Sequence, residues 1–171
     1  FFKASRVYGA ESYIMGFSGY VCEILTIYYG SFLNLIQAVP KWKDKEVIDI
    51  KRYYRGKNVF AEINKSKLNS PVIVIDPVQK DRNAAAALSV EKFEAFKKSA
   101  KEFLKNPSKD FFARKELKNE FLKESSKDNW LLAINITPLP GKIDVVGGKL
   151  LKIHNLFSEK LRKHGFKTKK A

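Results

Sequence analysis

The chain has 171 residues, of which 44% are hydrophobic and 13% aromatic, so it can bury a sizeable core and is not a disordered chain. Lys and Arg number 33 against 18 Asp and Glu, which leaves a formal net charge of +15. Such a charge favours a polyanionic partner, either nucleic acid or an anionic membrane surface, although a soluble protein from a lysine-rich proteome has the same composition.

The longest apolar run covers residues 20–36 and is broken by a glutamate, a glycine and an asparagine, so it is too polar to span a bilayer. No secretory signal opens the chain, and a start at Phe1 is typical of an excised or trimmed domain. The single cysteine, Cys22, lies within the apolar run, where a reduced thiol buried in the core is expected. These features predict a cytoplasmic protein with no membrane partner.

Two apolar helices are predicted in the first quarter of the chain. A Gly-Phe-Ser-Gly segment follows an extended lead-in of residues 1–15, and Ser18 within it is the predicted N-cap of the first helix. From Tyr20 to Tyr29 apolar residues occupy nearly every face, which predicts a buried central helix. A second apolar helix is expected from Phe32 to Val39.

The periodicity changes after residue 42. Three β-rich runs, residues 47–50, 59–63 and 72–75, are separated by polar turns. The simplest prediction is a small antiparallel sheet. Asp76-Pro77 closes its last strand, because proline offers no donor to a strand ladder and disfavours helix at the residue before it.

The second half of the chain predicts further helices. Ser89 is the predicted N-cap of a helix over residues 90–104, whose apolar side chains recur at three- and four-residue steps. A basic helix is expected around residues 113–122, and the change in composition at residue 125 predicts a domain boundary.

After the boundary, residues 130–137 are strand-like, residues 138–148 form a loop, and residues 149–163 form a basic amphipathic helix. The predicted fold class is α+β. It consists of a helical domain with a small sheet over residues 1–124, followed by a partial α/β unit over residues 125–171.

Three short motifs stand out in chain order. They are Val7-Tyr8-Gly9-Ala10-Glu11, Gly16-Phe17-Ser18-Gly19-Tyr20-Val21-Cys22-Glu23, and Asp76-Pro77-Val78 followed by Arg82-Asn83-Ala84-Ala85-Ala86. Together they resemble the archaeal-type (class I) CCA-adding enzymes, the tRNA nucleotidyltransferases that complete the 3′ end of tRNA. The resemblance covers residues 5–124 well and residues 130–166 more loosely. It falls on the second domain of that family and not on its catalytic head.

The resemblance implies a role for two residues. Tyr8 matches the tyrosine that contacts the triphosphate of bound CTP or ATP. Arg82 matches the arginine that reads the edge of the incoming base, with help from tRNA phosphates. The guanidinium suits this role, because its donors meet base acceptors that cytosine and adenine present and uracil and guanine do not.

The resemblance also implies what the parent enzyme needs. Its Mg²⁺ ions are held by carboxylates of the catalytic head, so this segment alone is expected to add no nucleotide. The expected substrates are CTP and ATP, and the expected partner is the acceptor stem and 3′ end of tRNA. A homodimeric parent protein is compatible with this assignment. The lysines of residues 97–127 and 149–163 suit phosphate contacts without sequence specificity.

A second pattern imitates a catalytic centre. Nucleotidyltransferases use a Gly-Ser pair followed by two carboxylates and a third from a neighbouring strand, and the carboxylates hold two Mg²⁺ ions. Gly30-Ser31, Asp44-Lys45-Glu46 and Asp76 match that pattern. Carboxylates at i and i+2 reach one metal only on a strand, where the residue between them points into the core. In this chain that residue is Lys45. We therefore interpret residues 41–46 as a solvated turn and expect no catalytic or metal-binding residue in this chain.

Other interpretations remain open on local grounds. Without the resemblance, Arg82 is a cap or salt-bridge residue and Tyr8 a surface aromatic. His154 and His164 are expected to face solvent. The chain as a whole is then a free-standing basic RNA-binding protein, or a segment of a related poly(A)- or oligoadenylate-type polymerase.

Overall fold

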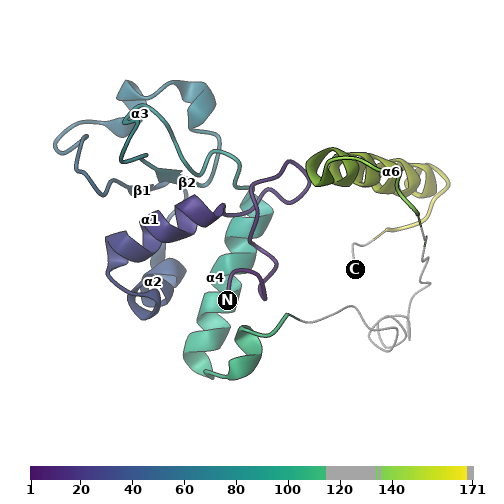
Figure 1. Cartoon of the computed structure of the whole chain (residues 1–171), viewed down its shortest axis with the longest axis horizontal. Helices are drawn as coiled ribbons and strands as arrows, with labels where there is room; N and C mark the ends of the chain where they lie inside the picture. The colour runs from purple at the N-terminus through teal and green to yellow at the C-terminus, as the bar shows by residue number, and fades with distance from the viewer. Residues whose placement is uncertain (115–133, 135, 169–171) are drawn as a thin grey trace. The chain divides into compact units, whose positions relative to one another are not determined.

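The computed structural model describes residues 1–114, 134 and 136–168 of the chain. The chain forms two compact units, residues 1–114 and residues 115–171 (Figure 1). Helices and a small sheet are both present, so the predicted α+β class is confirmed. The boundary expected after residue 124 and most of the basic helix expected at residues 113–122 lie outside the described residues, and both stay predictions.

The first two helices begin and end close to where the sequence places them. Helix α1 (Gly19–Tyr29) starts at Ser18, whose hydroxyl accepts a hydrogen bond from the Val21 amide at 3.2 Å, as predicted. Gly30 ends it in the left-handed region at φ 78°, where a side chain would be strained. Helix α2 (Phe32–Ala38) follows and packs against α1, and a 3₁₀ turn (Val39–Lys41) completes it.

The prediction that α1 is buried on all faces is wrong. Val21, Ile24 and Leu25 are buried, whereas Ile27 is 67% exposed and Glu23 faces solvent. The apolar pattern misled because α1 carries three tyrosines, whose rings count as apolar although their hydroxyls favour water. Helix α1 is therefore a surface helix with one buried face.

The sheet consists of β1 (Glu46–Ile48) and β2 (Val72–Val74), paired in parallel with Glu46 beside Val72 and Ile48 beside Val74. The antiparallel sheet predicted from the sequence is therefore wrong. Its middle strand is instead a short helix, α3 (Val59–Glu62), which Asn58 starts by accepting a hydrogen bond from the Phe60 amide at 3.0 Å. Without that strand, residues 49–71 act as a crossover, which parallel pairing requires.

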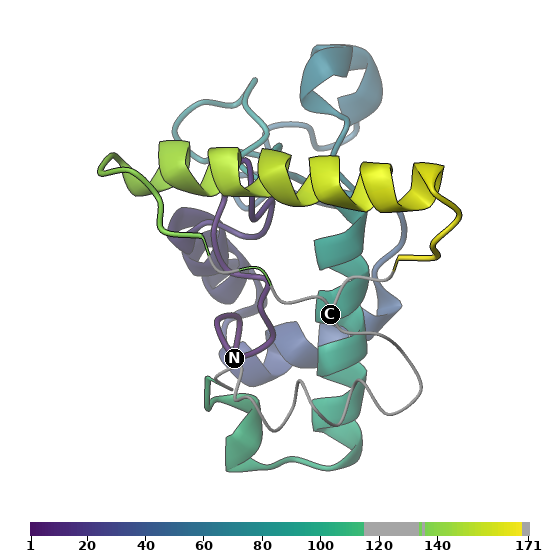
Figure 2. The ribbon, with the colours of Figure 1, turned by 90° about the vertical axis from the view of Figure 1, so that its right-hand side faces the viewer.

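The long helix α4 (Val90–Lys105) closes the first unit. Ser89 caps it by accepting a hydrogen bond from the Lys92 amide at 3.2 Å, as predicted. Figures 1 and 2 show α4 as the longest helix of this unit, with the chain turning back at its carboxyl end through a 3₁₀ turn (Lys109–Phe111). A further short 3₁₀ turn (Lys65–Lys67) precedes β2.

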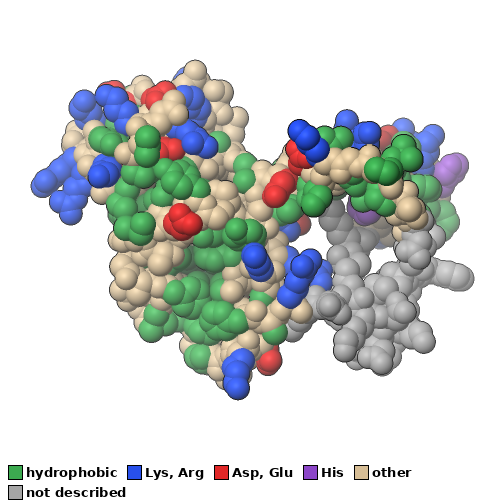
Figure 3. All heavy atoms as spheres, in the orientation of Figure 1, with side chains coloured by type: hydrophobic (Ala, Val, Ile, Leu, Met, Phe, Trp, Pro, Cys, Tyr) green, Lys and Arg blue, Asp and Glu red, His purple; other side chains and the backbone are tan. Residues whose placement is uncertain are grey.

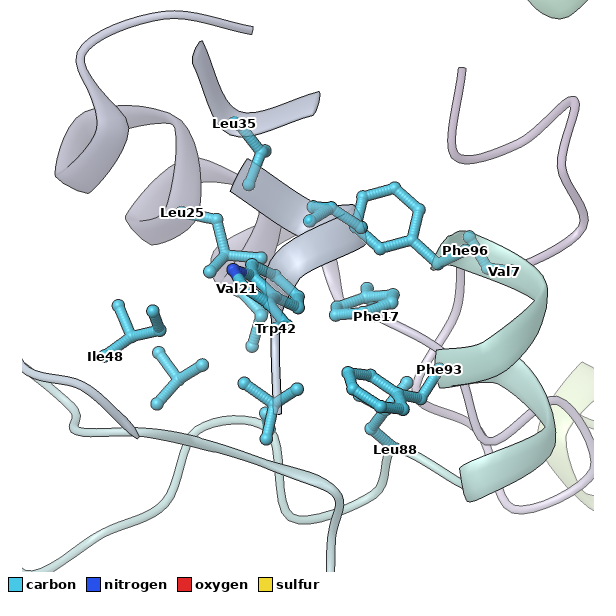
Figure 4. Close-up of a cluster of buried hydrophobic side chains, with 14 of the residues drawn as sticks. Val7, Phe17, Val21, Leu25, Leu35, Trp42, Ile48, Leu88, Phe93 and Phe96 are labelled. Atoms are coloured by element: carbon cyan, nitrogen blue, oxygen red, sulfur yellow. The ribbon is translucent and has the colours of Figure 1, made fainter. Parts of the chain in front are cut away.

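One aromatic and aliphatic core joins these elements. Phe93 and Phe96 of α4 enter it together with Phe17, Trp42 and buried residues of α1, α2 and the sheet (Figure 4). The Phe17 and Phe96 ring centroids lie 4.9 Å apart, and the Trp42 ring stacks on Phe93 at 6.3 Å. The segment that carries Tyr8 and the helix α1 are thus anchored in the same core.

The described part of the second unit contains helix α6 (Ile143–Lys163). The basic amphipathic helix predicted for residues 149–163 is confirmed, but it begins earlier, so the loop predicted for residues 138–148 is wrong from Ile143 onward. Gly147 and Gly148 lie inside the helix, and such a pair weakens a helical prediction. The strand predicted for residues 130–137 lies mostly outside the described residues.

Across residues 1–114, 134 and 136–168, no helix combines the length and the apolar character needed to cross a membrane.

Candidate functional site

The candidate site lies at one edge of the parallel sheet. The turn after β2, residues 76–82, carries Arg82 and is named the Arg82 turn. The chain leaving β1 enters a second turn at the same edge, because parallel strands share their carboxyl ends. Two tyrosines of that second turn hold the Arg82 turn: Tyr53 donates its hydroxyl proton to the Pro77 carbonyl at 2.8 Å, and Tyr54 donates to the Lys80 carbonyl at 2.9 Å.

Asn83 fixes the point where the Arg82 turn rejoins the sheet. Its side chain is buried, and its Oδ1 accepts hydrogen bonds from the amides of Val74 and Ala85, each at 3.0 Å. Its Nδ2 donates to the Lys67 carbonyl and to the Ser70 hydroxyl, each at 2.9 Å. The amide group is therefore fully used, which sets the return path of the chain.

Asp76 is the polar centre of the site. It is only 2% exposed. Its Oδ1 accepts from the Tyr20 hydroxyl at 2.9 Å and from the amides of Val78 and Gln79 at 2.8 and 3.2 Å, while its Oδ2 accepts from Arg82 Nη1 at 3.1 Å. Burial alone would raise the pKa of Asp76, but these donors and the Arg82 charge outweigh it, so its pKa lies below its ordinary value. Asp76 is held as a carboxylate.

Arg82 is clamped but still accessible. The salt bridge that its local sequence suggests is present, yet its side chain is 55% exposed. A guanidinium has five N–H donors, and one nitrogen is used on Asp76. Among the described residues no other acceptor is paired with its remaining donors, so they can bind a ligand from an orientation that Asp76 sets.

Backbone hydrogen bonds position the segment that carries Tyr8, and the Lys3 ammonium lies 5.1 Å from the centroid of the Tyr8 ring. The Phe17 amide donates to the Val7 carbonyl at 2.7 Å, and the Gly9 amide donates to the Phe17 carbonyl at 2.8 Å, so Tyr8 lies beside Phe17. Its side chain is 39% exposed. Its hydroxyl lies over Gly19, where an added Cβ would be only 3.0 Å from it.

Both predicted site residues therefore border the first turn of α1. Tyr8 reaches it at Gly19, and Arg82 reaches it through Asp76 and Tyr20. Within residues 1–114, no hydrogen bond joins Tyr8 to Arg82 directly. The amino end of a helix carries partial positive charge and unpaired amide donors, so this surface favours an anion.

Sequence reasoning missed several residues that build the site. Tyr20 was counted as part of an apolar helix face, and Tyr53 and Tyr54 were assigned no role. Asn83 was part of the third sequence motif but was assigned no role. The available signal was the position of a typical turn residue, Asn83, directly after Arg82, because asparagine often satisfies backbone groups at turns.

The alternative metal pattern does not converge in space. Glu46 pairs with Val72 at one end of β2, and Asp76 follows the other end of the same strand. Asp76 is four positions beyond Val72, which is about 13 Å along a strand, so the carboxylates of Glu46 and Asp76 lie far apart. The Lys45 ammonium donates to the carbonyls of Leu68 and Ser70 at 2.7 and 3.1 Å. No group of three or more His, Cys, Asp or Glu able to hold a metal is found in the described residues.

Cys22, His154 and His164 are the one cysteine and the two histidines of the chain. Burial raises the pKa of the Cys22 thiol to about 12, so it stays protonated and unreactive at neutral pH. His154 and His164, on and after α6, are exposed, as predicted.

Comparison with known proteins agrees with the motifs. A sequence model of the family described as "tRNA nucleotidyltransferase, second domain" matches residues 1–113. The CCA-adding enzyme of Nanoarchaeum equitans is 52% identical over 94 residues, which are 54% of this chain and 24% of that enzyme. The CCA-adding enzyme of Methanococcus maripaludis (strain C7) is 36% identical over 167 residues, 97% of this chain and 38% of that enzyme.

The CCA-adding enzyme of Pyrobaculum neutrophilum is also 36% identical, over 172 residues that are 98% of this chain and 36% of that enzyme. The chain thus spans between 24% and 38% of the length of these relatives.

Proposed function

This chain belongs to the tRNA nucleotidyltransferases of the CCA-adding type, and we propose that it forms the part that binds the incoming nucleotide and the tRNA end. The parent enzyme would add C, C and A to the tRNA 3′ end from CTP and ATP. Its catalytic carboxylates, and the Mg²⁺ ions that they bind, would belong to a part of the parent enzyme other than the described residues. The proposed partners are tRNA, CTP and ATP in the cytoplasm, and a homodimeric parent stays a prediction that gel filtration tests.

The observation that carries this proposal is the clamp on Arg82. A base-reading arginine needs free donors and a fixed orientation, and Arg82 has both, because Asp76 holds one nitrogen while the rest of the side chain stays exposed. Fixing the guanidinium in advance reduces the entropy lost when a base binds. Acceptors on one edge of cytosine and adenine would then meet its donors.

Tyr8 supports the other half of the proposal. Its hydroxyl lies at the first turn of α1, where amide donors and the helix dipole favour phosphate oxygens. All nucleoside triphosphates share that phosphate chain. Tyr8 would therefore contribute to affinity for every triphosphate, and Arg82 to the choice among them.

The test compares Arg82→Ala and Tyr8→Ala in the full-length parent enzyme, with single-turnover incorporation of CTP, ATP, UTP and GTP into tRNA lacking its CCA end. Arg82→Ala should lower the preference for CTP and ATP about tenfold or more, as losing a charge-assisted hydrogen bond predicts. Tyr8→Ala should weaken all four alike. Val78→Ala, at a side chain 88% exposed in the same turn, is the control. An unchanged preference in Arg82→Ala would refute the proposed role.

The proposal also predicts that the 171-residue chain alone adds no labelled CTP or ATP to such a tRNA. Incorporation by this chain that disappears in Asp44→Ala would instead prove that the alternative carboxylate pattern is catalytic.

A further inference from the structure

The turn that holds the Arg82 turn is itself strongly basic. Residues 51–57, named the basic turn, read Lys-Arg-Tyr-Tyr-Arg-Gly-Lys, and no acidic residue occurs between Lys51 and Ala61. The four cations are exposed, and within the described residues none of them forms an ion pair; they are Lys51, Arg52, Arg55 and Lys57. Figure 3 shows Lys and Arg side chains gathered at the end of this unit that carries α3 and the sheet.

Hydrogen bonds within residues 49–57 order the basic turn. The Tyr54 amide donates to Asp49 Oδ2 at 2.9 Å, the Arg55 amide to the Arg52 carbonyl at 3.2 Å, and the Lys57 amide to the Tyr54 carbonyl at 2.9 Å. Arg52 adopts a left-handed backbone at φ 56°, which costs free energy for a residue with a side chain. Like charges are thus held close together, and a bound polyanion would relieve their repulsion.

The position of the basic turn identifies the polyanion. Tyr53 and Tyr54 tie the basic turn to the Arg82 turn, where the exposed Lys80 adds a further cation. If Arg82 reads the incoming base, the RNA strand that receives this nucleotide must end beside it. A nucleic-acid strand carries one phosphate per about 3.4 Å of its axis in a duplex, so the last phosphates of that strand fall within reach of the basic turn.

We propose that the basic turn binds the phosphodiester backbone of the single-stranded 3′ end of the RNA substrate. This inference rests on the proposed function. Four cations spread over residues 51–57 match a chain of separated charges better than the compact triphosphate, which the Tyr8 side of the site would receive. The binding is to backbone phosphates and selects no base sequence.

The experiment removes three of the charges without removing the tyrosines. The test variant carries Lys51→Gln, Arg55→Gln and Lys57→Gln. The matched control carries Lys41→Gln, Lys43→Gln and Lys65→Gln, which remove the same charge from exposed positions of the first unit outside residues 51–57 and 97–127. Both variants are made in the 171-residue chain, and their thermal melts must agree with that of the unchanged chain.

Binding is measured with a labelled acceptor-stem minihelix that has a short single-stranded 3′ overhang, and with its blunt-ended form. We expect the slope of log K against log salt concentration to become shallower by about 2 in the test variant, since each single-strand phosphate contact contributes about 0.7. The preference for the overhang should also disappear. The control should keep the preference for the overhang.

Three outcomes overturn the inference. They are equal losses in the test and control variants, an unchanged preference for the overhang in the test variant, and, in a separate titration with CTP, weaker CTP binding without weaker RNA binding. The last outcome would assign the basic turn to the triphosphate. Failure of the proposed function is seen separately, in the nucleotide preference of Arg82→Ala, because the minihelix assay contains no nucleotide.

Discussion

Tyr8 and Arg82 border the same helix end but are held in place by different means. Backbone hydrogen bonds between residues 7–9 and 16–17 position Tyr8, and they depend on the close approach of two chain segments at Gly16. Arg82 is positioned by side chains, chiefly Asn83 and Asp76, which are both buried. The Tyr8 side should therefore be sensitive to added bulk, and the Arg82 side to the loss of polar partners and to acid pH.

The largest effect is expected on the Arg82 side, from Asn83→Ala. The substitution removes a hydrogen-bond partner from two amides, a carbonyl and the Ser70 hydroxyl, of which the hydroxyl keeps its bond to the Val72 carbonyl. The free energy of unfolding should fall by about 2 to 4 kcal/mol, because each buried polar group left unpaired carries a desolvation cost. Urea denaturation monitored by circular dichroism measures it. A loss no larger than that of Val78→Ala would contradict this description of the turn.

Gly16→Ala should break the Tyr8 side. An added Cβ would collide with the Val7 carbonyl group and lie 3.0 Å from the Gly9 carbonyl oxygen. Both obstacles are backbone atoms, so the two chain segments must move apart, at a cost of about 1 to 3 kcal/mol. Affinity for all triphosphates should fall in parallel, measured by calorimetry of the parent enzyme. An unchanged triphosphate affinity in Gly16→Ala would contradict this description of the Tyr8 side.

Asp76→Asn tests the pH sensitivity of the Arg82 side. The pKa of Asp76 in the folded chain lies below its ordinary value of 3.8, so its stabilisation is present above that value and is lost as pH falls through the folded pKa. The unsubstituted chain should therefore lose stability below about pH 4, and Asp76→Asn should lose less of it over that range. Urea midpoints measured in steps from neutral to acid pH record the two curves.

Asp76→Asn should also lower the preference for CTP and ATP over UTP and GTP, because a neutral amide would no longer hold the Arg82 guanidinium by charge. The affinity for triphosphates that depends on Tyr8 should stay unchanged. Identical losses of stability at acid pH in the two chains would show that Asp76 does not titrate as described.

Tyr20→Phe should have the smallest effect on stability. It removes one of the donors to Asp76 and leaves the amides of Val78 and Gln79 in place, so the free energy of unfolding should fall by about 1 kcal/mol. The pKa of Asp76 should rise, because the lost hydrogen bond favours the carboxylate. Carboxyl carbon chemical shifts followed by NMR titration measure this rise. An Asp76 pKa that is the same in both chains would show that the Tyr20 hydroxyl does not stabilise the carboxylate.

Local signals predicted the helices well and the sheet poorly. Ser18 and Ser89 were identified as N-caps because capping depends on neighbours a few residues away. Whether β1 and β2 pair in parallel or antiparallel depends instead on residues 49–71, which connect them. Within that connection Asn58 starts a short helix, although asparagine at this position also suits a turn between two strands. The motifs located Tyr8 and Arg82, but the hydrogen bond from Tyr20 to Asp76 joins residues that are 56 positions apart.

The parallel pairing of β1 with β2 has a consequence for the order of folding. The two strands cannot meet until residues 49–71 have closed a long loop, and closing it costs chain entropy before any strand pairing repays it. Helices α1 and α4 face no such delay, because their hydrogen bonds are local. The Arg82 turn and the basic turn both follow the carboxyl ends of these strands, so the ligand-binding surface should be among the last parts of the domain to form.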